Sequence, residues 1–160
     1  MRKLRLYLDT SIINFALADD INEKDKEGTR QLCKEINQGK YEGFISEVVI
    51  REINNTKDSE KQKRLINYVE KITLSEILEG NNEVDILAQK YISEQIIPAR
   101  YEDDALHIAL ATVNEIDILV SWNFKHLVKH KTRIEVNGVN NLMGYRNIDI
   151  CTPLEVIEDV

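Results

Sequence analysis

The chain has 160 residues, a formal net charge of −7, 42% hydrophobic residues and 31% charged residues. This length suits one domain, residues 1–160, with a sizeable core, and the composition argues against a disordered chain. No apolar run comes near the roughly 20 residues of a membrane-spanning helix, and the basic N-terminus lacks the apolar stretch of a signal peptide. The two cysteines have no metal-ligand spacing and are typical of reduced thiols. The sequence therefore predicts a cytoplasmic protein without a membrane segment.

Charge is distributed unevenly along the chain. Residues 76–104 contain eight acids and two bases, whereas residues 118–134 contain no acid, four lysines or arginines and two histidines. The negative total argues against non-specific binding of nucleic acid over the whole surface. It leaves room for a local basic face at 118–134.

Strand-like and helix-like patterns alternate from the N-terminus onward. Residues 4–8 become continuously apolar, which predicts a buried strand, and Asp9 follows that strand at the start of a helix. Apolar spacing and capping residues predict the next elements in chain order: a helix at 23–38, a strand at 41–45, a short helix capped by Ser46, and amphipathic helices at 60–72 and 82–93.

The second half of the chain continues this alternation. Residues 105–113 are apolar on nearly every side, which predicts a buried helix whose first turn contains three acids. The elements expected after it are a buried strand at 117–121, a helical turn at 124–128, a strand or an irregular extended piece at 133–136, a loop at 137–147, a strand at 148–150 and a short helix from 152. This order indicates an α/β fold with a mainly parallel central sheet.

Four side chains with oxygen donors fall at strand ends or on the helices that follow: Asp9, Glu52, Asp104 and Asn123. In a parallel sheet these positions share one edge, which is where ligands bind in open α/β folds. Carboxylates gathered there raise one another's pKa unless a cation neutralises them, and a hard divalent ion suits oxygen ligands. Each acid taken alone has a structural alternative, as a helix cap or a solvated surface charge.

Four segments then resemble, in family order, the successive motifs of PIN-domain proteins, a family that includes the VapC-type toxins of toxin–antitoxin pairs. The segments are Leu8-Asp9-Thr10-Ser11, Ile45-Ser-Glu-Val-Val-Ile-Arg-Glu52, Asp104-Ala-Leu-His-Ile-Ala109 and Leu119-Val-Ser-Trp-Asn123. The similarity runs from about residue 4 to residue 150. Segments 121–127 and 144–153 resemble a prokaryotic subgroup of PIN proteins predicted to bind nucleic acid.

The resemblance implies a Rossmann-like, three-layer α/β/α sandwich and a ribonuclease that depends on Mg²⁺ or Mn²⁺. Position by position, Asp9, Glu52 and Asp104 match the family's catalytic, metal-binding acids. Asn123 stands where many members have a fourth acid. As a metal ligand it would contribute a carbonyl oxygen without a charge, which would leave a second metal position weaker or absent. Asp103 or Asp117 could compensate, although neither matches a family motif.

Five further side chains are candidate substrate contacts: Thr10, Ser11, His107, Lys125 and Lys129. Thr10 and Ser11 match polar residues that hold the first acid or its water shell, and the lysines could bind backbone phosphates or simply form a solvated face. His107 lies on the helix face of Asp104, either as a partner of phosphate or carboxylate or as a hydrogen-bonded core residue. Trp122 either stacks on an unpaired base or packs in the core.

The function favoured at this point is a metal-dependent endoribonuclease that hydrolyses RNA phosphodiester bonds. The resemblance leaves open whether it is the toxin of a type II pair, silenced by an antitoxin protein, and implies a homodimer. One alternative is a catalytically weak or inactive PIN-like module that binds RNA or a partner, because Asn123 replaces an acid. A Rossmann-type nucleotide-binding enzyme is disfavoured, since no glycine-rich phosphate loop follows the first strand.

Overall fold

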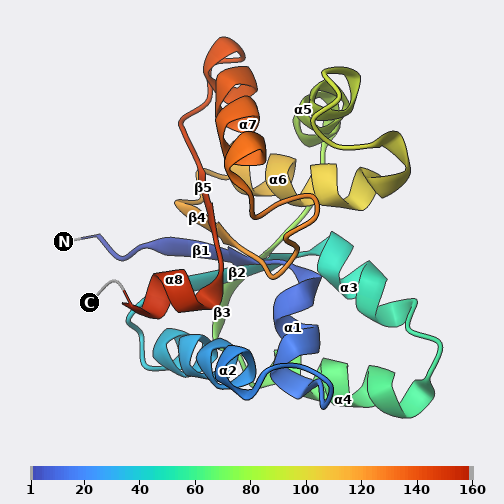
Figure 1. Cartoon of the computed structure of the whole chain (residues 1–160), viewed down its shortest axis with the longest axis vertical. Coiled ribbons are helices and arrows are strands. Elements are labelled where there is room, and N and C mark those ends of the chain that lie inside the picture. Colours follow the sequence, from blue (N-terminus) through green and yellow to red (C-terminus); the bar gives the residue numbers. More distant parts are fainter. Residues whose placement is uncertain (1, 159–160) are drawn as a thin grey trace.

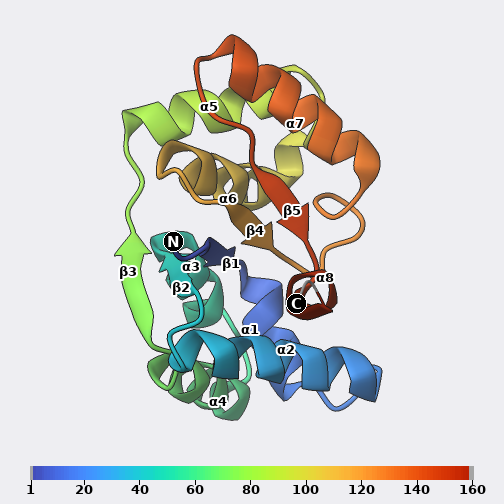
Figure 2. The same ribbon diagram turned by 90° about the vertical axis from the view of Figure 1, so that its left-hand side faces the viewer.

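Five parallel strands form one sheet in the order β3-β2-β1-β4-β5, which Figure 2 shows across the molecule. The computed structural model describes residues 2–158. The strands are β1 (Arg5–Leu8), β2 (Glu42–Ser46), β3 (Leu74–Leu78), β4 (Ile118–Val120) and β5 (Asp149–Cys151). Because β1 pairs with both β2 and β4, it lies at the centre of the sheet.

Helices cover both faces of this sheet. Figure 1 shows α5, α6 and α7 above the strands and α1, α2 and α4 below them. The helices are α1 (Thr10–Leu17), α2 (Glu23–Asn37), α3 (Glu47–Asn54), α4 (Ser59–Glu70), α5 (Asn82–Ser93), α6 (Glu102–Val113), α7 (His130–Leu142) and α8 (Pro153–Glu158), with a 3₁₀ turn, η1 (Ala99–Tyr101), before α6. The expected three-layer α/β/α sandwich with a parallel central sheet is thereby confirmed.

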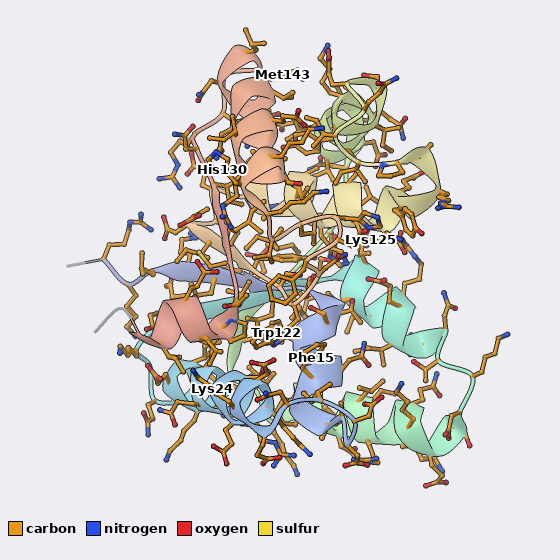
Figure 3. All side chains as sticks on the ribbon, in the orientation of Figure 1. Phe15, Lys24, Trp122, Lys125, His130 and Met143 are labelled. Carbon is orange, nitrogen blue, oxygen red and sulfur yellow. The ribbon has the colours of Figure 1, made fainter. Side chains whose placement is uncertain are left out.

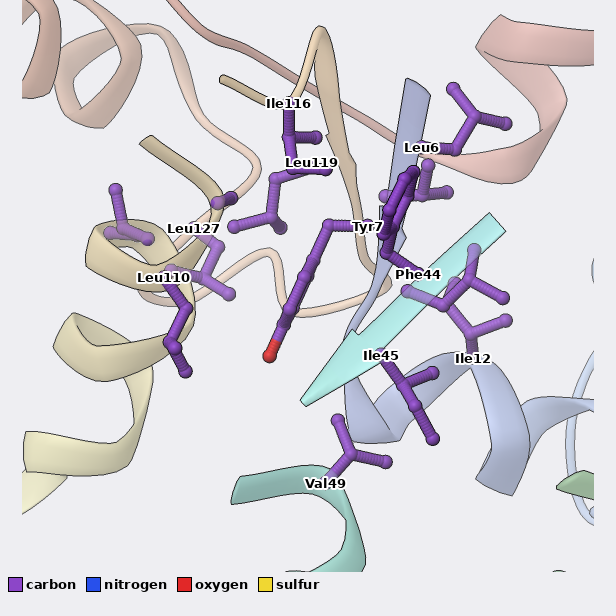
Figure 4. Close-up of a cluster of buried hydrophobic side chains, with 14 of the residues drawn as sticks. Leu6, Tyr7, Ile12, Phe44, Ile45, Val49, Leu110, Ile116, Leu119 and Leu127 are labelled. Carbon is purple, nitrogen blue, oxygen red and sulfur yellow. The ribbon is translucent and has the colours of Figure 1, made fainter. Parts of the chain in front are cut away.

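The core lies on both sides of the central strands. Leu6, Tyr7 and Leu8 have no exposed surface, although they alternate between the two faces of the sheet. Strands buried on both faces are continuously apolar, which is the pattern seen in β1. Figure 4 shows Tyr7 and Leu119 of the two adjacent central strands within one apolar cluster that also includes Leu110 of α6.

Two helices begin where the sequence places their caps. The Asp9 carboxylate accepts a hydrogen bond from the Ser11 N–H at 3.1 Å, and the Ser46 hydroxyl accepts one from the Val48 N–H at 3.1 Å. Both are helix N-caps of the usual kind, which satisfy backbone donors that have no partner within the helix. They place the starts of α1 and α3 directly above the carboxyl ends of β1 and β2.

The structure corrects two parts of the sequence interpretation. Residues 133–136, expected to be extended, and the first part of 137–147, expected to be a loop, belong to helix α7, whose buried side chains recur at helical spacing. Strand β3 was absent from the predicted elements because it is an edge strand with only Leu78 fully buried. The strands and helices expected elsewhere lie within a few residues of the predicted ranges.

A search of the helices over residues 2–158 finds none with both the length and the apolar character needed to cross a bilayer.

Asp117 lies just before β4, at the edge of the sheet opposite to Asp9, so it cannot supply a fourth acid beside Asp9. Its carboxylate accepts hydrogen bonds from the Arg2 guanidinium at 2.9 Å and from the Arg5 N–H at 2.8 Å. Although burial alone would raise it, the pKa of Asp117 is lowered by these two donors.

We expect Asp117→Asn to lower the free energy of unfolding by about 1 kcal/mol at pH 7. Because the folded-state pKa lies below the unfolded value of about 3.9, the stabilisation is complete above that value and is lost as pH falls through the folded-state pKa. Urea unfolding at pH 7 and pH 2.5 tests this, and Arg2→Gln should account for part of the same loss. An equal loss at both pH values would contradict the assignment.

Candidate active site

The candidate site lies above the carboxyl ends of β1 and β4, where the chain connections diverge to opposite sides of the sheet. Leu8 pairs with Val120 in the parallel register, so the residues that follow each of them, Asp9 and Ser121, are neighbours. The N-terminus of α6 and the polar side of α3 approach the same edge through hydrogen bonds described below. The structure thus brings together elements separated by more than 100 residues in the sequence.

Asp9 is the most buried acid of the site, with 4% of its surface exposed. One carboxylate oxygen, Oδ1, accepts hydrogen bonds from the N–H and the hydroxyl of Ser11, and Oδ2 accepts one from the Ser121 hydroxyl. Burial raises the pKa of Asp9, the positive charge of His107 and the two serines offset part of that rise, and the negative charge of Asp104 adds to it. Keeping Asp9 ionised in the folded protein therefore costs free energy, and a nearby cation would reduce that cost.

Glu52 on α3 is held by a row of buried hydrogen bonds. Its Oε1 accepts a hydrogen bond from the Thr10 hydroxyl at 2.7 Å and lies 2.7 Å from His107 Nε2. The other ring nitrogen, His107 Nδ1, lies 2.6 Å from the Tyr7 hydroxyl, which in turn lies 2.7 Å from the Ser46 hydroxyl. This row fixes the carboxylate of Glu52 relative to β1, β2 and α6.

The pKa values of Glu52 and His107 shift in opposite directions. Burial alone would raise the pKa of Glu52, but the hydrogen bond and charge of His107 bring it below its usual value. Burial alone would lower the pKa of His107, but the hydrogen bond to Glu52 and the charges of Asp9 and Asp104 raise it. The two groups therefore favour each other's charged forms.

Asp104, in the first turn of α6, faces the loop after β4. Its Oδ2 lies 2.8 Å from His126 Nδ1 and accepts a long hydrogen bond, 3.4 Å, from the Asn123 amide nitrogen. Burial raises the pKa of Asp104, and the hydrogen bond from His126 offsets part of that rise. The negative charge of Glu52 adds a little to the rise in this pKa.

The structure places the Asn123 side chain, an expected metal ligand, between the turn after β4 and Asp104. Its amide oxygen accepts a hydrogen bond from the His126 N–H at 3.0 Å, and its amide nitrogen faces Asp104. The side chain therefore caps the turn after β4 and holds Asp104, and its amide oxygen accepts one hydrogen bond with one of its two lone pairs.

The structure places His107, an expected substrate contact, in the interior of the protein. It is 2% exposed and both ring nitrogens are hydrogen bonded, so it positions Glu52 from below. His107 is therefore both a hydrogen-bonded core residue and a partner of a carboxylate.

The remaining candidate residues separate into two groups. Thr10 and Ser11 hold Glu52 and Asp9, respectively, through their hydroxyls. Lys125 and Lys129 are exposed on the loop after β4. Trp122 packs instead of projecting, since it is 5% exposed, stacks on Phe15 with ring centres 5.1 Å apart and donates to Thr29.

Asp103, considered as a compensating acid, pairs with Arg51 on the outer side of the site.

Two residues of the site, Ser121 and His126, were absent from the candidates. Both supply hydrogen bonds to the predicted acids. The pairing of β1 with β4 would have located Ser121 beside Asp9, but that pairing is not evident from one sequence. His126 reaches Asp104 only through the turn that Asn123 caps.

The residue types at this site fit a divalent cation. Among the side chains of residues 2–157, no three from His, Cys, Asp and Glu are close enough together to hold an ion. Each acid of the site is instead hydrogen bonded to serine, threonine or histidine partners of its own. However, Glu52 Oε2 and Asp104 Oδ1 accept no hydrogen bond within that range. Carboxylate oxygens of this kind are the ligands that Mg²⁺ and Mn²⁺ prefer.

Comparison with known proteins identifies the fold. No protein-family model and no curated protein matches the chain. VapBC2 from Rickettsia felis, solved bound to a DNA fragment from its promoter, matches over 92% of this chain and 97% of its own, with 15% identity and a TM-score of 0.58. DNA-bound VapBC from Salmonella typhimurium matches over 94% and 98%, with 18% identity and a TM-score of 0.55. Because VapC is a PIN-domain protein, the chain has the PIN fold that its motifs resemble.

Proposed function

We propose that the chain is a metal-dependent endoribonuclease in which Asp9, Glu52 and Asp104 hold one or two Mg²⁺ or Mn²⁺ ions. The main support is the convergence of three carboxylates on one sheet edge, where burial and mutual repulsion raise the pKa values of Asp9 and Asp104. A bound divalent ion would polarise the phosphodiester and lower the pKa of the attacking water. In that reaction water adds to phosphorus and the bond to the 3′ oxygen breaks, which leaves 3′-hydroxyl and 5′-phosphate ends.

The surrounding residues would position these acids. Ser11 and Ser121 hold Asp9, and Thr10 and His107 hold Glu52, which would leave these two carboxylates little freedom. Pre-positioned charged groups stabilise a transition state more effectively than groups that must reorganise.

The experiment is an RNA cleavage assay paired with calorimetric titration of Mn²⁺. We expect wild-type protein to bind Mn²⁺ and to cleave a mixed-sequence RNA, cleavage to stop in EDTA, and Asp104→Asn to lose both properties. Asp103→Asn is the matched control. It removes one negative charge from the neighbouring position, where the acid pairs with Arg51. A wild-type protein that binds no Mn²⁺ and does not cleave, or an Asp104→Asn variant as active as wild type, would refute the proposal.

The second candidate function is a PIN-like module that binds RNA or a partner without cutting. The observation that favours it is Asn123, whose oxygen is engaged in a turn and whose amide brings no negative charge. The two functions differ in one result of the same assay, since the module would bind RNA without turnover at any Mn²⁺ concentration.

The VapBC structures are toxin–antitoxin complexes, which supports an antitoxin partner for this chain. We further propose that the chain is a cytoplasmic toxin and forms a homodimer. Co-expression with the product of a small adjacent gene would test the partner. Relief of growth inhibition and co-purification are the expected results.

Asn123→Asp should make the site depend more strongly on metal. Without metal, a new carboxylate would replace the amide that now donates to Asp104 at 3.4 Å, so we expect a lower melting temperature in EDTA. With saturating Mn²⁺ the extra charge should strengthen binding, and the rise in melting temperature on adding Mn²⁺ should exceed that of wild type. Thermal unfolding in both conditions tests this, and an equal Mn²⁺-induced rise would contradict it.

A further inference from the structure

Beside the carboxylates, two cations converge on one aromatic ring. The Arg100 guanidinium carbon lies 5.0 Å from the centre of the Tyr101 ring, and the Lys125 ammonium lies 5.8 Å from it. Arg100 comes from η1 and Lys125 from the loop after β4, so two separate segments bring positive charge to the same place. Figure 3 shows Lys125 on that loop, near the start of α6.

Neither cation is neutralised by the protein. With the side chains of residues 2–157, Arg100 and Lys125 form no salt bridge, whereas the nearby Arg51 is paired with Asp103. Cations held over an aromatic face gain some attraction from the ring, but they also repel each other. An anion between them would be attracted by both.

This cluster adjoins the candidate active site directly. The Tyr101 ring lies 4.1 Å, centre to centre, from the ring of His126, whose Nδ1 contacts Asp104. In a chain with a net charge of −7, a pair of free cations next to an acidic site is a local exception. Arg and Lys placed in this way are typical contacts to backbone phosphates, which position a nucleic acid without reading its sequence.

An exposed aromatic side chain precedes Lys125. Phe124 is 58% exposed, and its ring packs against Trp122 in a T-shaped arrangement with ring centres 6.1 Å apart. Trp122 is itself stacked on Phe15. Trp122 thus supports Phe124 from within the core and leaves much of its surface open to solvent. A base can stack on such a ring only when it is unpaired.

We propose that Arg100, Tyr101 and Lys125 form a phosphate-binding subsite, and Phe124 a base-stacking position, that together bind single-stranded RNA next to the cleavage site. This inference rests on the proposed function, because it names the form of RNA that the carboxylate centre would receive. The subsite acts on binding of the strand and takes no part in the chemical step.

The first test measures binding of a fluorescently labelled 12-nucleotide RNA by anisotropy in EDTA, where no cleavage occurs. Arg100→Gln with Lys125→Gln should weaken binding about tenfold and make the dependence of log K on log salt less steep by about 0.7 for each lost phosphate contact. The charge-matched control is Lys24→Gln with Lys34→Gln, two exposed positions on α2. Figure 3 shows Lys24 well away from Lys125.

The second test concerns the stacking position. Phe124→Ala should weaken binding of the single strand about tenfold, and Phe124→Tyr should restore it, because tyrosine keeps the ring. Ile134→Ala, at a position 60% exposed on α7, is the control for loss of an exposed apolar side chain. A blunt RNA duplex of the same sequence should bind more weakly than the single strand and should not respond to Phe124→Ala.

The results separate this subsite from the proposed function. If wild type cleaves RNA but the cation and Phe124 variants bind it as well as the controls do, the subsite is refuted and the nuclease stands. If wild type does not cleave but the variants weaken binding of the single strand as expected, the nuclease fails and the subsite stands. Failure of wild type to bind the single strand at micromolar concentration, or equal binding of the duplex, would also overturn the subsite.

Discussion

Asp9→Asn is expected to abolish RNA cleavage while leaving the metal-free fold at least as stable as wild type. The substitution removes a charge proposed to hold the metal, and loss of several kcal/mol of transition-state stabilisation corresponds to about a thousandfold in rate. Asparagine is as good a helix N-cap as aspartate, so the start of α1 should be retained.

The stability gain follows from the pKa of Asp9. Its folded-state pKa is raised above the usual value, mainly by burial, so the ionised carboxylate destabilises the folded state at neutral pH, and this cost disappears as pH falls below the unfolded pKa. We therefore expect the variant to be more stable than wild type at pH 7 in EDTA, with no difference at pH 3. Stability gained by relieving a functional site is a common trade-off.

Thermal unfolding in EDTA and in Mn²⁺, together with the cleavage assay, tests both parts. Asp20→Asn, at an exposed loop position, is the control for loss of one acid and should change neither property. Saturating Mn²⁺ should reverse the order of stability, because only wild type gains binding energy. Cleavage at the wild-type rate would refute the metal-site assignment, and a lower melting temperature in EDTA would refute the cost ascribed to burial.

The central part of the fold could be predicted because its local patterns agree with its tertiary environment. In β1, continuous apolar residues match a strand that is buried on both faces, and the following Asp9 is both a cap and the end of a central strand. In α6, the apolar residues after Asp104 match a helix enclosed by the sheet and its neighbours. The location of the acids at one edge of the sheet could be predicted from β1, α6 and the parallel arrangement of the strands.

Helix α7 could not be predicted because its stability comes from distant contacts. Asparagine and glycine are poor helix formers, and residues 137–141 contain three asparagines and one glycine. The Asn137 amide bonds to the backbone N–H and C=O of Ile148, and Asn140 contacts Tyr91 and Thr112. These bonds join α7 to the residue before β5, to α5 and to α6. Residues that are common in loops therefore stabilise this helix through contacts with other elements.

The positions of the candidate acids and two of their partners, Ser11 and His107, could be predicted. The partners Ser121 and His126 could not. Asp9, Glu52 and Asp104 lie at positions that the strand and helix pattern defines. The roles of Asn123 and His107 depend on side-chain directions, since the Asn123 oxygen turns toward a backbone N–H and both His107 nitrogens turn inward. The directions of these side chains depend on packing in the folded core and cannot be predicted from the spacing of residues in the sequence.

His107→Leu is expected to lower both activity and stability without touching substrate. Leucine fills much of the buried space but leaves Glu52 without its donor on that side and removes the partner of the Tyr7 hydroxyl. Loss of a residue that holds a metal ligand costs about 10–100-fold in metal affinity or activity, so we expect a loss of that size. Thr10 still holds Glu52, which is why the loss should be smaller than that of Asp9→Asn.

The stability change should depend on pH. The folded-state pKa of His107 is raised above its usual value of about 6.5, so its contribution is complete below that value and is lost as pH rises through the folded-state pKa. In EDTA we expect His107→Leu to lose about 2 kcal/mol at pH 5.5 and clearly less at pH 9. Urea unfolding at the two pH values measures this difference.

A conservative variant separates positioning from packing. Tyr7→Phe keeps the aromatic ring and the His107–Glu52 contact but removes the hydroxyl that joins His107 to Ser46. If the row of hydrogen bonds positions Glu52, this variant should weaken Mn²⁺ binding measurably, whereas Tyr91→Phe, which removes another buried hydroxyl distant from the acids, should not. Equal Mn²⁺ affinities for wild type, Tyr7→Phe and His107→Leu would show that the buried row only stabilises the core.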